Sequence, residues 1–349
     1  MISNTALFMI GIQGKQLTDA ECQLLQHPLT AGVILFTRNY DNPDQITQFV
    51  NTLRETATND LLIAVDHEGG RVQRFRDGFT AIPPMATFGA LYDDKQAAHC
   101  PQQIAHAAGY VMAHEIAACD IDFSFAPVLD LQTDFSTIIG DRAFHENPDI
   151  IGELAAAFYA GMREAGTIGV GKHFPGHGGV VADSHLELPV STADFATLQQ
   201  TEIQPFKHLI EAGIEAIMPA HILYSQVDGM PAGFSNFWLA EVLRHQLGFN
   251  GAIISDDLDM AGAAAFGGMA DRVALAAKNC DLILLCNDFD SMQIAYQCQP
   301  ITPDNDRQAR LTALQRNKAA LNTTNSGATQ SNRYNTLKTL LLKARLQHH

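Results

Sequence analysis

The stretch from residue 168 to residue 185 reads IGVGKHFPGHGGVVADSH and joins an apolar run to a loop of reactive side chains. Its apolar part, residues 168–171, predicts a buried strand, and Lys172 and His173 follow directly. The glycines that come next allow the backbone to approach a ligand closely. The stretch therefore predicts a strand that delivers polar side chains to a functional loop at its carboxyl end.

Apolar runs of this kind recur along the chain, at residues 6–14, 32–38, 61–66, 123–131, 168–173, 216–221, 252–256 and 281–287. Most are continuous rather than alternating, which is typical of strands that are covered on both faces in a parallel sheet. Between these apolar runs, two Asn-Pro pairs and one further asparagine mark the starts of helices. These helices are predicted over residues 42–55, 147–164 and 238–247. Eight strand–helix units in 349 residues predict an α/β fold, a (β/α)₈ barrel of the TIM type.

No break in composition marks a second domain. We assign residues 1–300 to a single catalytic barrel domain and residues 301–349 to a peripheral C-terminal segment. Within that segment the polar run TTNSGATQSN, residues 323–332, predicts a loop or mobile stretch. Residues 334–347 predict a basic terminal helix.

The composition narrows the classes of partner. A formal net charge of −16 disfavours binding to nucleic acid or to an anionic membrane. No apolar stretch is long enough to span a bilayer, and the N-terminus lacks the pattern of a signal peptide. The six cysteines form no CxxC pair, which fits buried thiols in a reducing compartment. We therefore expect a cytoplasmic enzyme that acts on a small molecule. We also expect a monomer, although the composition does not decide the oligomeric state.

Polar side chains gather at one end of the predicted strands. They follow the apolar runs at Arg38-Asn39, Asp66-His67-Glu68, Asp130, Lys172-His173, His221, Asp256-Asp257 and Asn287-Asp288, and the amino ends carry nothing comparable. Active sites of such barrels are built at the carboxyl ends of the strands. The asymmetry therefore predicts an active site at that face.

Two groups of residues have the chemistry of acid–base and nucleophilic catalysis. Asp183 and His185 lie two residues apart, a spacing at which a carboxylate can orient an imidazole and stabilise its protonated form. Asp256, Asp257 and Asp259 follow a predicted strand, where they are candidates for a nucleophile. Aspartates are also favoured as caps at the start of a helix, so the same three residues could cap the helix that follows.

A metal site is the alternative use of the histidine-rich loop. His173, His177, Asp183 and His185 are residue types that bind zinc, but no compact motif such as HExxH is present. We therefore expect neither a metal nor a cofactor.

Several motifs together resemble glycoside hydrolase family 3, in particular its single-domain bacterial β-N-acetylglucosaminidases of peptidoglycan recycling. The motifs occur in the family's order, at residues 35–40 (LFTRNY), 66–74 (DHEGGRVQR), 139–142 (IGDR), 172–178 (KHFPGHG) with 183–185 (DSH) and Pro189, 218–221 (MPAH) and 255–258 (SDDL). The resemblance extends from about residue 6 to about residue 290. It implies a barrel fold and hydrolysis of glycosidic bonds.

The resemblance also implies a role for each matched residue. Asp256 matches the catalytic nucleophile, His185 the general acid/base, and Asp183 the partner of that histidine. The matched sugar-binding residues are Asp66, Arg74, Arg142, Lys172 and His173. The implied substrate is N-acetylglucosamine linked β-1,4 to 1,6-anhydro-N-acetylmuramic acid, with or without its peptide. The implied reaction is hydrolysis with retention of configuration, through a covalent glycosyl-enzyme.

The sequence departs from the family pattern at a few positions. His67 stands where glutamine is common, Asp259 replaces a commoner serine, and Gly179 and Val180 vary the loop before Asp183. None of these changes removes a matched catalytic group.

Two other functions remain open for this sequence. One is phosphorolysis, because a histidine acid repels an incoming phosphate less than a carboxylate does. The other is a barrel that binds amino sugars without catalysis, although the presence of both nucleophile and acid candidates argues against it.

Overall fold

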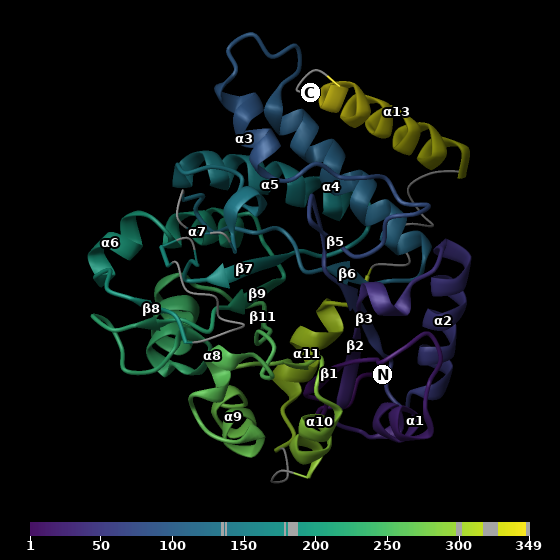
Figure 1. Cartoon of the computed structure of the whole chain (residues 1–349), viewed down its shortest axis with the longest axis vertical. Coiled ribbons are helices and arrows are strands. Elements are labelled where there is room, and N and C mark those ends of the chain that lie inside the picture. Colours follow the sequence, from purple (N-terminus) through teal and green to yellow (C-terminus); the bar gives the residue numbers. More distant parts are fainter. Residues whose placement is uncertain are drawn as a thin grey trace.

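The structure is a computed structural model, and it describes residues 1–133, 136, 138–177, 179–180, 188–297, 302–316 and 327–346. In these residues the chain is an α/β protein, with parallel strands at the centre and helices around them (Figure 1). No helix within the described ranges is both long enough and apolar enough to cross a membrane.

The central strands form two parallel sheets. The larger sheet has the order β12 (Ile283–Leu285), β1 (Phe8–Gly11), β2 (Thr30–Leu35), β3 (Leu62–Val65) and β6 (Phe123–Ser124). The smaller sheet has the order β11 (Ala252–Ile253), β9 (Ala216–Pro219) and β7 (Val170–Phe174). Each of the eight predicted runs overlaps one of these strands, so the prediction of parallel strands is confirmed.

The predicted closed barrel is not confirmed, because the hydrogen-bonded ladder is interrupted at both junctions between the sheets. Only isolated parallel bridges occur there among the described residues, at Phe123 with Ile168, Val128 with Lys172, and Ile254 with Leu282.

Each interruption has a local cause. Pro127 follows β6 and has no N–H to donate to a neighbouring strand. At the other junction the Ser255 hydroxyl oxygen, rather than a main-chain carbonyl, accepts from the Leu284 N–H at 3.1 Å.

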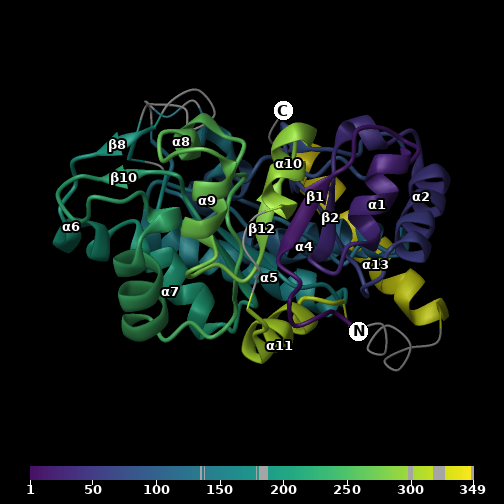
Figure 2. The ribbon, with the colours of Figure 1, turned by 90° about the horizontal axis from the view of Figure 1, so that it is seen from below.

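Two short pairs of strands lie outside the central sheets. β4 (His67–Gly69) and β5 (Val72–Gln73) form an antiparallel hairpin directly after β3. Gly69 and Gly70 turn this hairpin with φ angles of +118° and +54°, which favour glycine. β8 (Val190–Ser191) and β10 (Leu223–Tyr224) pair on the side of the molecule away from the first two helices (Figure 2).

The helices cover the outside of the strands. They are α1 (Asp19–Gln26), α2 (Pro43–Thr56), α3 (Ala86–Asp93), α4 (Pro101–Ala118), α5 (Pro148–Glu164), α6 (Phe195–Gln200), α7 (Ile203–Glu211), α8 (Ala261–Ala264), α9 (Met269–Ala276), α10 (Phe289–Tyr296), α11 (Asn305–Ala313) and α13 (Gly327–Leu346). Shorter turns are the 3₁₀-helices η1 (Thr37–Asn39), η2 (Gly140–Arg142) and η3 (Ala232–Phe234), and η4 (Phe237–Gln246) is a π-helix.

The predicted helix starts are confirmed by side-chain caps. The Asn42 side chain accepts from the Gln45 N–H at the start of α2, and the Asn147 side chain accepts from the Asp149 N–H at the start of α5. In both helices a proline occupies the first turn, where no N–H is needed. The helix predicted over residues 238–247 is present as η4, but with π-helical geometry.

The core follows the two-residue alternation of the strands. Met9, Ile34, Leu62, Val170 and Met218, from both sheets, belong to one buried central cluster. Their sequence neighbours point outward against the helices. Fully burying one such side chain stabilises the fold by roughly 1.5–3 kcal/mol. The space that the two sheets enclose is therefore a packed core. A cavity can form only at the ends of the strands, and it lies at their carboxyl ends.

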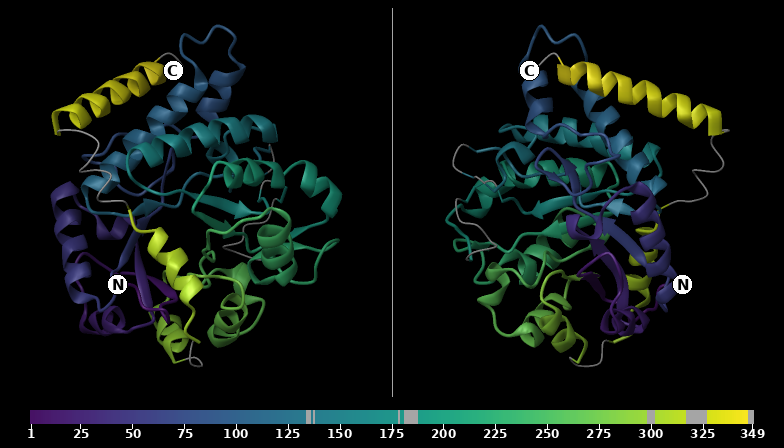
Figure 3. Two further views of the ribbon diagram at one scale, coloured as in Figure 1. Left: turned by 180° about the vertical axis from the view of Figure 1, so that it is seen from behind. Right: turned by 45° about the vertical axis from the view of Figure 1, so that its right-hand side comes forward.

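The C-terminal helix α13 runs across one end of the molecule and packs against α4 (Figure 3). It begins at residue 327, seven residues before the predicted start at residue 334. Leu337 and Leu341 are buried on its inner face. Residues 327–332 of the predicted loop are helical, so that part of the prediction is wrong, and residues 323–326 lie outside the described residues.

Candidate active site

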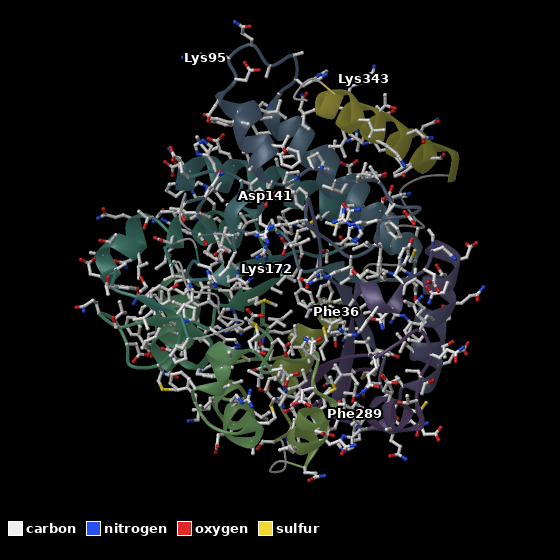
Figure 4. The ribbon with its side chains drawn as sticks, in the orientation of Figure 1. Phe36, Lys95, Asp141, Lys172, Phe289 and Lys343 are labelled. Carbon is white, nitrogen blue, oxygen red and sulfur yellow. The ribbon has the colours of Figure 1, made fainter. Side chains whose placement is uncertain are left out.

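A cavity of about 370 Å³ opens at the carboxyl ends of the central strands. Six of the predicted site residues line it, namely Asp66, Arg74, Arg142, Lys172, His173 and Asp256. Lys172 and Phe36, which both face this cavity, lie near the middle of the molecule (Figure 4). The other two predicted residues, Asp183 and His185, lie outside the described residues. The structure therefore brings together, from four separate segments, every predicted site residue that it describes.

One wall of the cavity is a network of paired charges. The Lys172 ammonium lies 3.0 Å from an Asp66 oxygen and 2.7 Å from a Glu68 oxygen. Arg142 donates two hydrogen bonds to the Glu68 carboxylate, at 2.9 and 2.8 Å. Arg74 donates to the other Asp66 oxygen at 3.1 Å. Such paired charges hold one another in fixed geometry before a ligand arrives.

The pairing keeps both carboxyl groups ionised. Burial alone would raise the pKa of Glu68, but Arg142 and Lys172 outweigh it and lower that pKa to about 2. Burial likewise opposes ionisation of Asp66, whereas Lys172 and Arg74 hold its pKa far below the ordinary value. The wall therefore presents both anionic acceptors and cationic donors.

Local structure explains how this wall is built. Asp66 and Glu68 are two residues apart in extended backbone, so their side chains point to the same side. The Gly69-Gly70 turn then returns the chain along β5, which brings Arg74 back to Asp66. Glu68 lies at a strand end that the sequence marks as polar, but it is absent from the predicted site residues. Its position beside Asp66 was the available signal, but its partners are 74 and 104 residues away along the chain.

A third carboxylate, Asp130, fixes His173 and His177. Asp130 accepts from the His173 ring nitrogen Nδ1 at 2.7 Å, and from the backbone N–H groups of His173 and His177 at 3.2 and 2.7 Å. Burial opposes ionisation of Asp130, but His173 and these hydrogen bonds lower its pKa. Asp130 thus orients the His173 imidazole and fixes the backbone at His173 and His177. It is also absent from the predicted site residues, although its place at a strand end was noted.

The three aspartates after β11 have different surroundings. Asp257 accepts from the N–H groups of Asp259 and Cys286, at 3.1 and 3.2 Å, and from the Asn287 side chain at 3.2 Å. One Asp259 oxygen accepts from two backbone N–H groups after β12. Asp256 lines the cavity and accepts from the Asp257 N–H at 2.8 Å.

The alternative prediction, that these aspartates cap the helix that follows them, is wrong. Helix α8 begins at Ala261, its N-cap residue is Met260, and no side chain makes a capping hydrogen bond there. Asp257 and Asp259 instead tie the end of β11 to the end of β12, because their hydrogen bonds reach Cys286 and Asn287.

We expect the stability of the protein to depend on the titration of Asp257. Burial, Asp259 and Asp256 raise the pKa of Asp257 to about 7. A carboxyl whose pKa is raised by folding contributes stability below its unfolded pKa and loses it as the pH rises through the folded value. The Asp257→Asn variant, which carries no charge at any pH, should therefore gain about 3 kcal/mol relative to the original protein between pH 5 and pH 8.

Thermal unfolding of both proteins at the two pH values measures this difference. Asp306→Asn, which changes an exposed carboxylate on α11, is the matched control and should give no such difference. A stability difference for Asp257→Asn that is the same at pH 5 and pH 8 would contradict the expectation.

No metal cluster is evident within the described ranges, where no group of three or more His, Cys, Asp or Glu residues is placed to hold an ion. Two residues of the alternative metal site, Asp183 and His185, are outside those ranges. The absence of a metal therefore stays a prediction.

Known proteins share both the sequence and the fold. Residues 5–310 match the model of the glycosyl hydrolase family 3 N-terminal domain. A β-hexosaminidase of Methylobacillus flagellatus is 51% identical over 284 residues, which cover 81% of this chain and 80% of the relative. A β-hexosaminidase of Tolumonas auensis is 52% identical over 283 residues, which cover 80% of this chain and 82% of that protein.

A solved structure gives the same result in three dimensions. NagZ from Neisseria gonorrhoeae, in complex with N-trifluoroacetyl-D-glucosamine, superposes with a TM-score of 0.87. It is 37% identical, and the match covers 97% of this chain and 98% of that one. The family model alone spans most of the chain, including every cavity residue described above. This chain therefore belongs to glycosyl hydrolase family 3.

Proposed function

We propose that this chain, a β-N-acetylhexosaminidase, removes terminal β-linked N-acetylglucosamine from peptidoglycan fragments by retaining hydrolysis. The observation that carries this proposal is the cavity in which a network of fixed donors and acceptors shares one space with the Asp256 carboxylate. A natural substrate is N-acetylglucosamine linked β-1,4 to 1,6-anhydro-N-acetylmuramic acid, with or without its peptide. We place the reaction in the cytoplasm, because the family resemblance of the sequence implies a cytoplasmic substrate.

The charged wall suits a sugar because each hydroxyl group both donates and accepts hydrogen bonds. Asp66 and Glu68 would accept from hydroxyl groups, while Lys172, Arg74 and Arg142 would donate to them. The cavity also has apolar lining, from Phe125, Met218 and Met260 among others, which can pack against the C–H face of the ring. The N-trifluoroacetyl-D-glucosamine in the gonococcal NagZ complex supports the choice of an amino sugar.

The reaction would take place in two steps. In the first, an Asp256 oxygen bonds to the anomeric carbon, the glycosidic bond breaks, and His185 gives its proton to the departing oxygen. In the second, His185 takes a proton from water, the hydroxide attacks the anomeric carbon, and the bond to Asp256 breaks. Two inversions give overall retention. A histidine suits both steps because its ordinary pKa lies near neutral pH, and Asp183 would hold its tautomer.

Chain geometry supports a position for His185 near Asp256. The backbone of His177 is fixed by Asp130, and His177 lines the same cavity as Asp256. His185 is only eight residues further along, a length that reaches at most about 26–29 Å. The fixed position of His177 at the cavity therefore supports a role for His185 as the acid at this site.

We also propose that the eight strands form one (β/α)₈ barrel, with residues 1–300 as the catalytic domain and residues 301–349 as a peripheral segment. Bridges at both junctions between the sheets and the central cluster that both sheets share support this arrangement. The polar wall at the carboxyl ends of the strands is also where barrel enzymes have their active sites.

The test of the function is incubation of the purified protein with aryl glycosides of N-acetylglucosamine, glucose and N-acetylgalactosamine. We expect release of free N-acetylglucosamine, at a rate that added phosphate does not change. Formation of the sugar 1-phosphate in phosphate buffer would instead identify a phosphorylase. Binding of N-acetylglucosamine without turnover of any glycoside would identify a non-catalytic sugar-binding protein.

Removal of a cation from the charged wall should weaken sugar binding. Arg142→Ala and Lys172→Met each delete donors, and a hydrogen bond to a charged group contributes roughly 1.5–3 kcal/mol. We therefore expect affinity for N-acetylglucosamine to fall about ten- to a hundredfold, with a loss of turnover as well, because these donors also orient the ring. Calorimetry measures the affinity, and circular dichroism checks that each variant is folded.

The matched control for this pair is Lys95→Ala, which deletes an exposed cation at the edge of the molecule (Figure 4). Its affinity for the sugar should equal that of the original protein. Unchanged affinity in both Arg142→Ala and Lys172→Met would show that the sugar binds elsewhere.

A further inference from the structure

The C-terminal helix α13 and the segment after the β4–β5 hairpin share a partner, the carboxylate of Glu115 on α4. The Tyr334 hydroxyl donates to one Glu115 oxygen, and the Lys338 ammonium lies 3.5 Å from the same oxygen. Lys338 also donates to the Tyr334 hydroxyl at 2.8 Å. Only 11% of the Glu115 side chain is exposed, so these contacts are made in a largely desolvated place.

The same carboxylate holds the far end of the segment that follows the β4–β5 hairpin. The Thr80 backbone N–H donates to Glu115 at 2.7 Å, and the Thr80 hydroxyl donates to its other oxygen. Thr80 in turn accepts, through its carbonyl, from the Gln73 side chain at 3.0 Å. The Gln73 side chain also accepts from the Ile82 N–H at 3.0 Å. Glu115 thus lies between the helix and the base of the hairpin.

The hairpin and the residues that flank it carry three members of the charged wall, Asp66, Glu68 and Arg74. Gln73 pairs with His67 across the hairpin, and it lies next to Arg74 in the chain. The Arg74 N–H donates to the Asp66 carbonyl at 3.3 Å, in addition to the bond between their side chains. A displacement of residues 73–82 would therefore move Arg74 and Asp66 relative to the cavity.

Helix α13 is packed firmly enough to act as an anchor. The Tyr334 ring stacks on the His114 ring of α4, with the ring centroids 4.8 Å apart. Leu337 and Leu341 of the same helix are buried. Arg333 forms two hydrogen bonds with Glu164 of α5. The helix therefore holds Tyr334 in place by contacts that do not depend on Glu115.

We propose that Glu115 is a positioning residue for the sugar site, and that α13 contributes to sugar binding by fixing Glu115. The inference rests on the proposed role of Asp66 and Arg74 in sugar binding. It assigns a function to a helix that lies beyond the family match, which ends at residue 310. Loss of a partner leaves a buried acceptor or donor unsatisfied, and the segment would shift to relieve this.

The test compares kinetic constants for an aryl N-acetylglucosaminide. Glu115→Ala should raise KM roughly tenfold and Tyr334→Phe roughly threefold, with kcat of each variant within about twofold of the original, because a loosened wall affects ground-state binding first. Glu115→Gln keeps an acceptor for the Thr80 N–H and should restore KM to within about twofold. In the same variants, amide hydrogen exchange over residues 67–82 should be faster in the order of the KM increases.

The matched control is Arg333→Ala, which weakens the contact of the same helix with α5 but leaves Glu115 and its partners in place. Its KM should be unchanged. If Glu115→Ala and Arg333→Ala lower thermal stability alike and neither changes KM or exchange in residues 67–82, Glu115 is a structural residue and the inference fails. If the original protein turns over no glycoside, the proposed function fails, and the exchange measurement alone decides the inference.

Discussion

Replacement of Asp256 by asparagine is expected to lower turnover of an aryl N-acetylglucosaminide by about four orders of magnitude or more, while sugar affinity stays within roughly tenfold. The amide has nearly the same shape and can still accept the hydrogen bond from the Asp257 N–H. It cannot form the ester bond to the anomeric carbon, which develops only in the transition state. Steady-state kinetics and calorimetry on the same preparation measure the two quantities.

Asp257→Asn is the matched variant, since it changes the neighbouring carboxylate. Asp257 accepts from donors on the neighbouring strand end, so its loss should affect stability more than chemistry. A severe loss of turnover in Asp257→Asn with normal turnover in Asp256→Asn would show that the nucleophile is the second aspartate.

Replacement of His185 by alanine should give a loss that depends on the leaving group. A natural disaccharide leaves as a poor alkoxide and needs a proton, whereas dinitrophenolate leaves without one. We expect turnover of the disaccharide to fall about 10²–10⁴-fold, and formation of the glycosyl-enzyme from the dinitrophenyl glycoside to be nearly normal. Rates with both substrates measure the difference.

The same variant should accumulate the covalent intermediate, because the base that activates water is also missing. A burst of dinitrophenol and an adduct on the intact protein, mapped to Asp256, are the expected signs. Asp183→Ala should show a milder form of this pattern, since the imidazole remains without its orienting partner. Equal losses with good and poor leaving groups, and no adduct, would return His185 to a positional role.

The strands could be predicted because their signal is local. A continuous apolar run such as residues 281–287 specifies a buried parallel strand, and a polar residue after it specifies the end that faces the cavity. The interruptions of the ladder follow from local features too, yet they were not foreseen. Pro127 lies inside the apolar run of residues 123–131, where its missing N–H argues against a full strand although the apolar residues favour one.

The site was predicted where a residue type and a motif coincide, as at Lys172 and Arg142. It was missed where the role depends on distant partners, as at Glu68 and Asp130. Nothing in the segment around Glu68 shows that the chain turns at Gly69-Gly70 and brings this carboxylate to Arg142 and Lys172. The role of Asp130 likewise appears only when the end of β7 lies beside it.

The most direct test of the central claim is to follow by proton NMR the cleavage of N-acetylglucosamine-β-1,4-anhydro-N-acetylmuramic acid by the original protein. Retaining hydrolysis through Asp256 predicts that the first N-acetylglucosamine to appear is the β-anomer, which then equilibrates slowly with the α-anomer. Initial release of the α-anomer, or of a sugar 1-phosphate when phosphate is present, would contradict the account, as would an intact disaccharide.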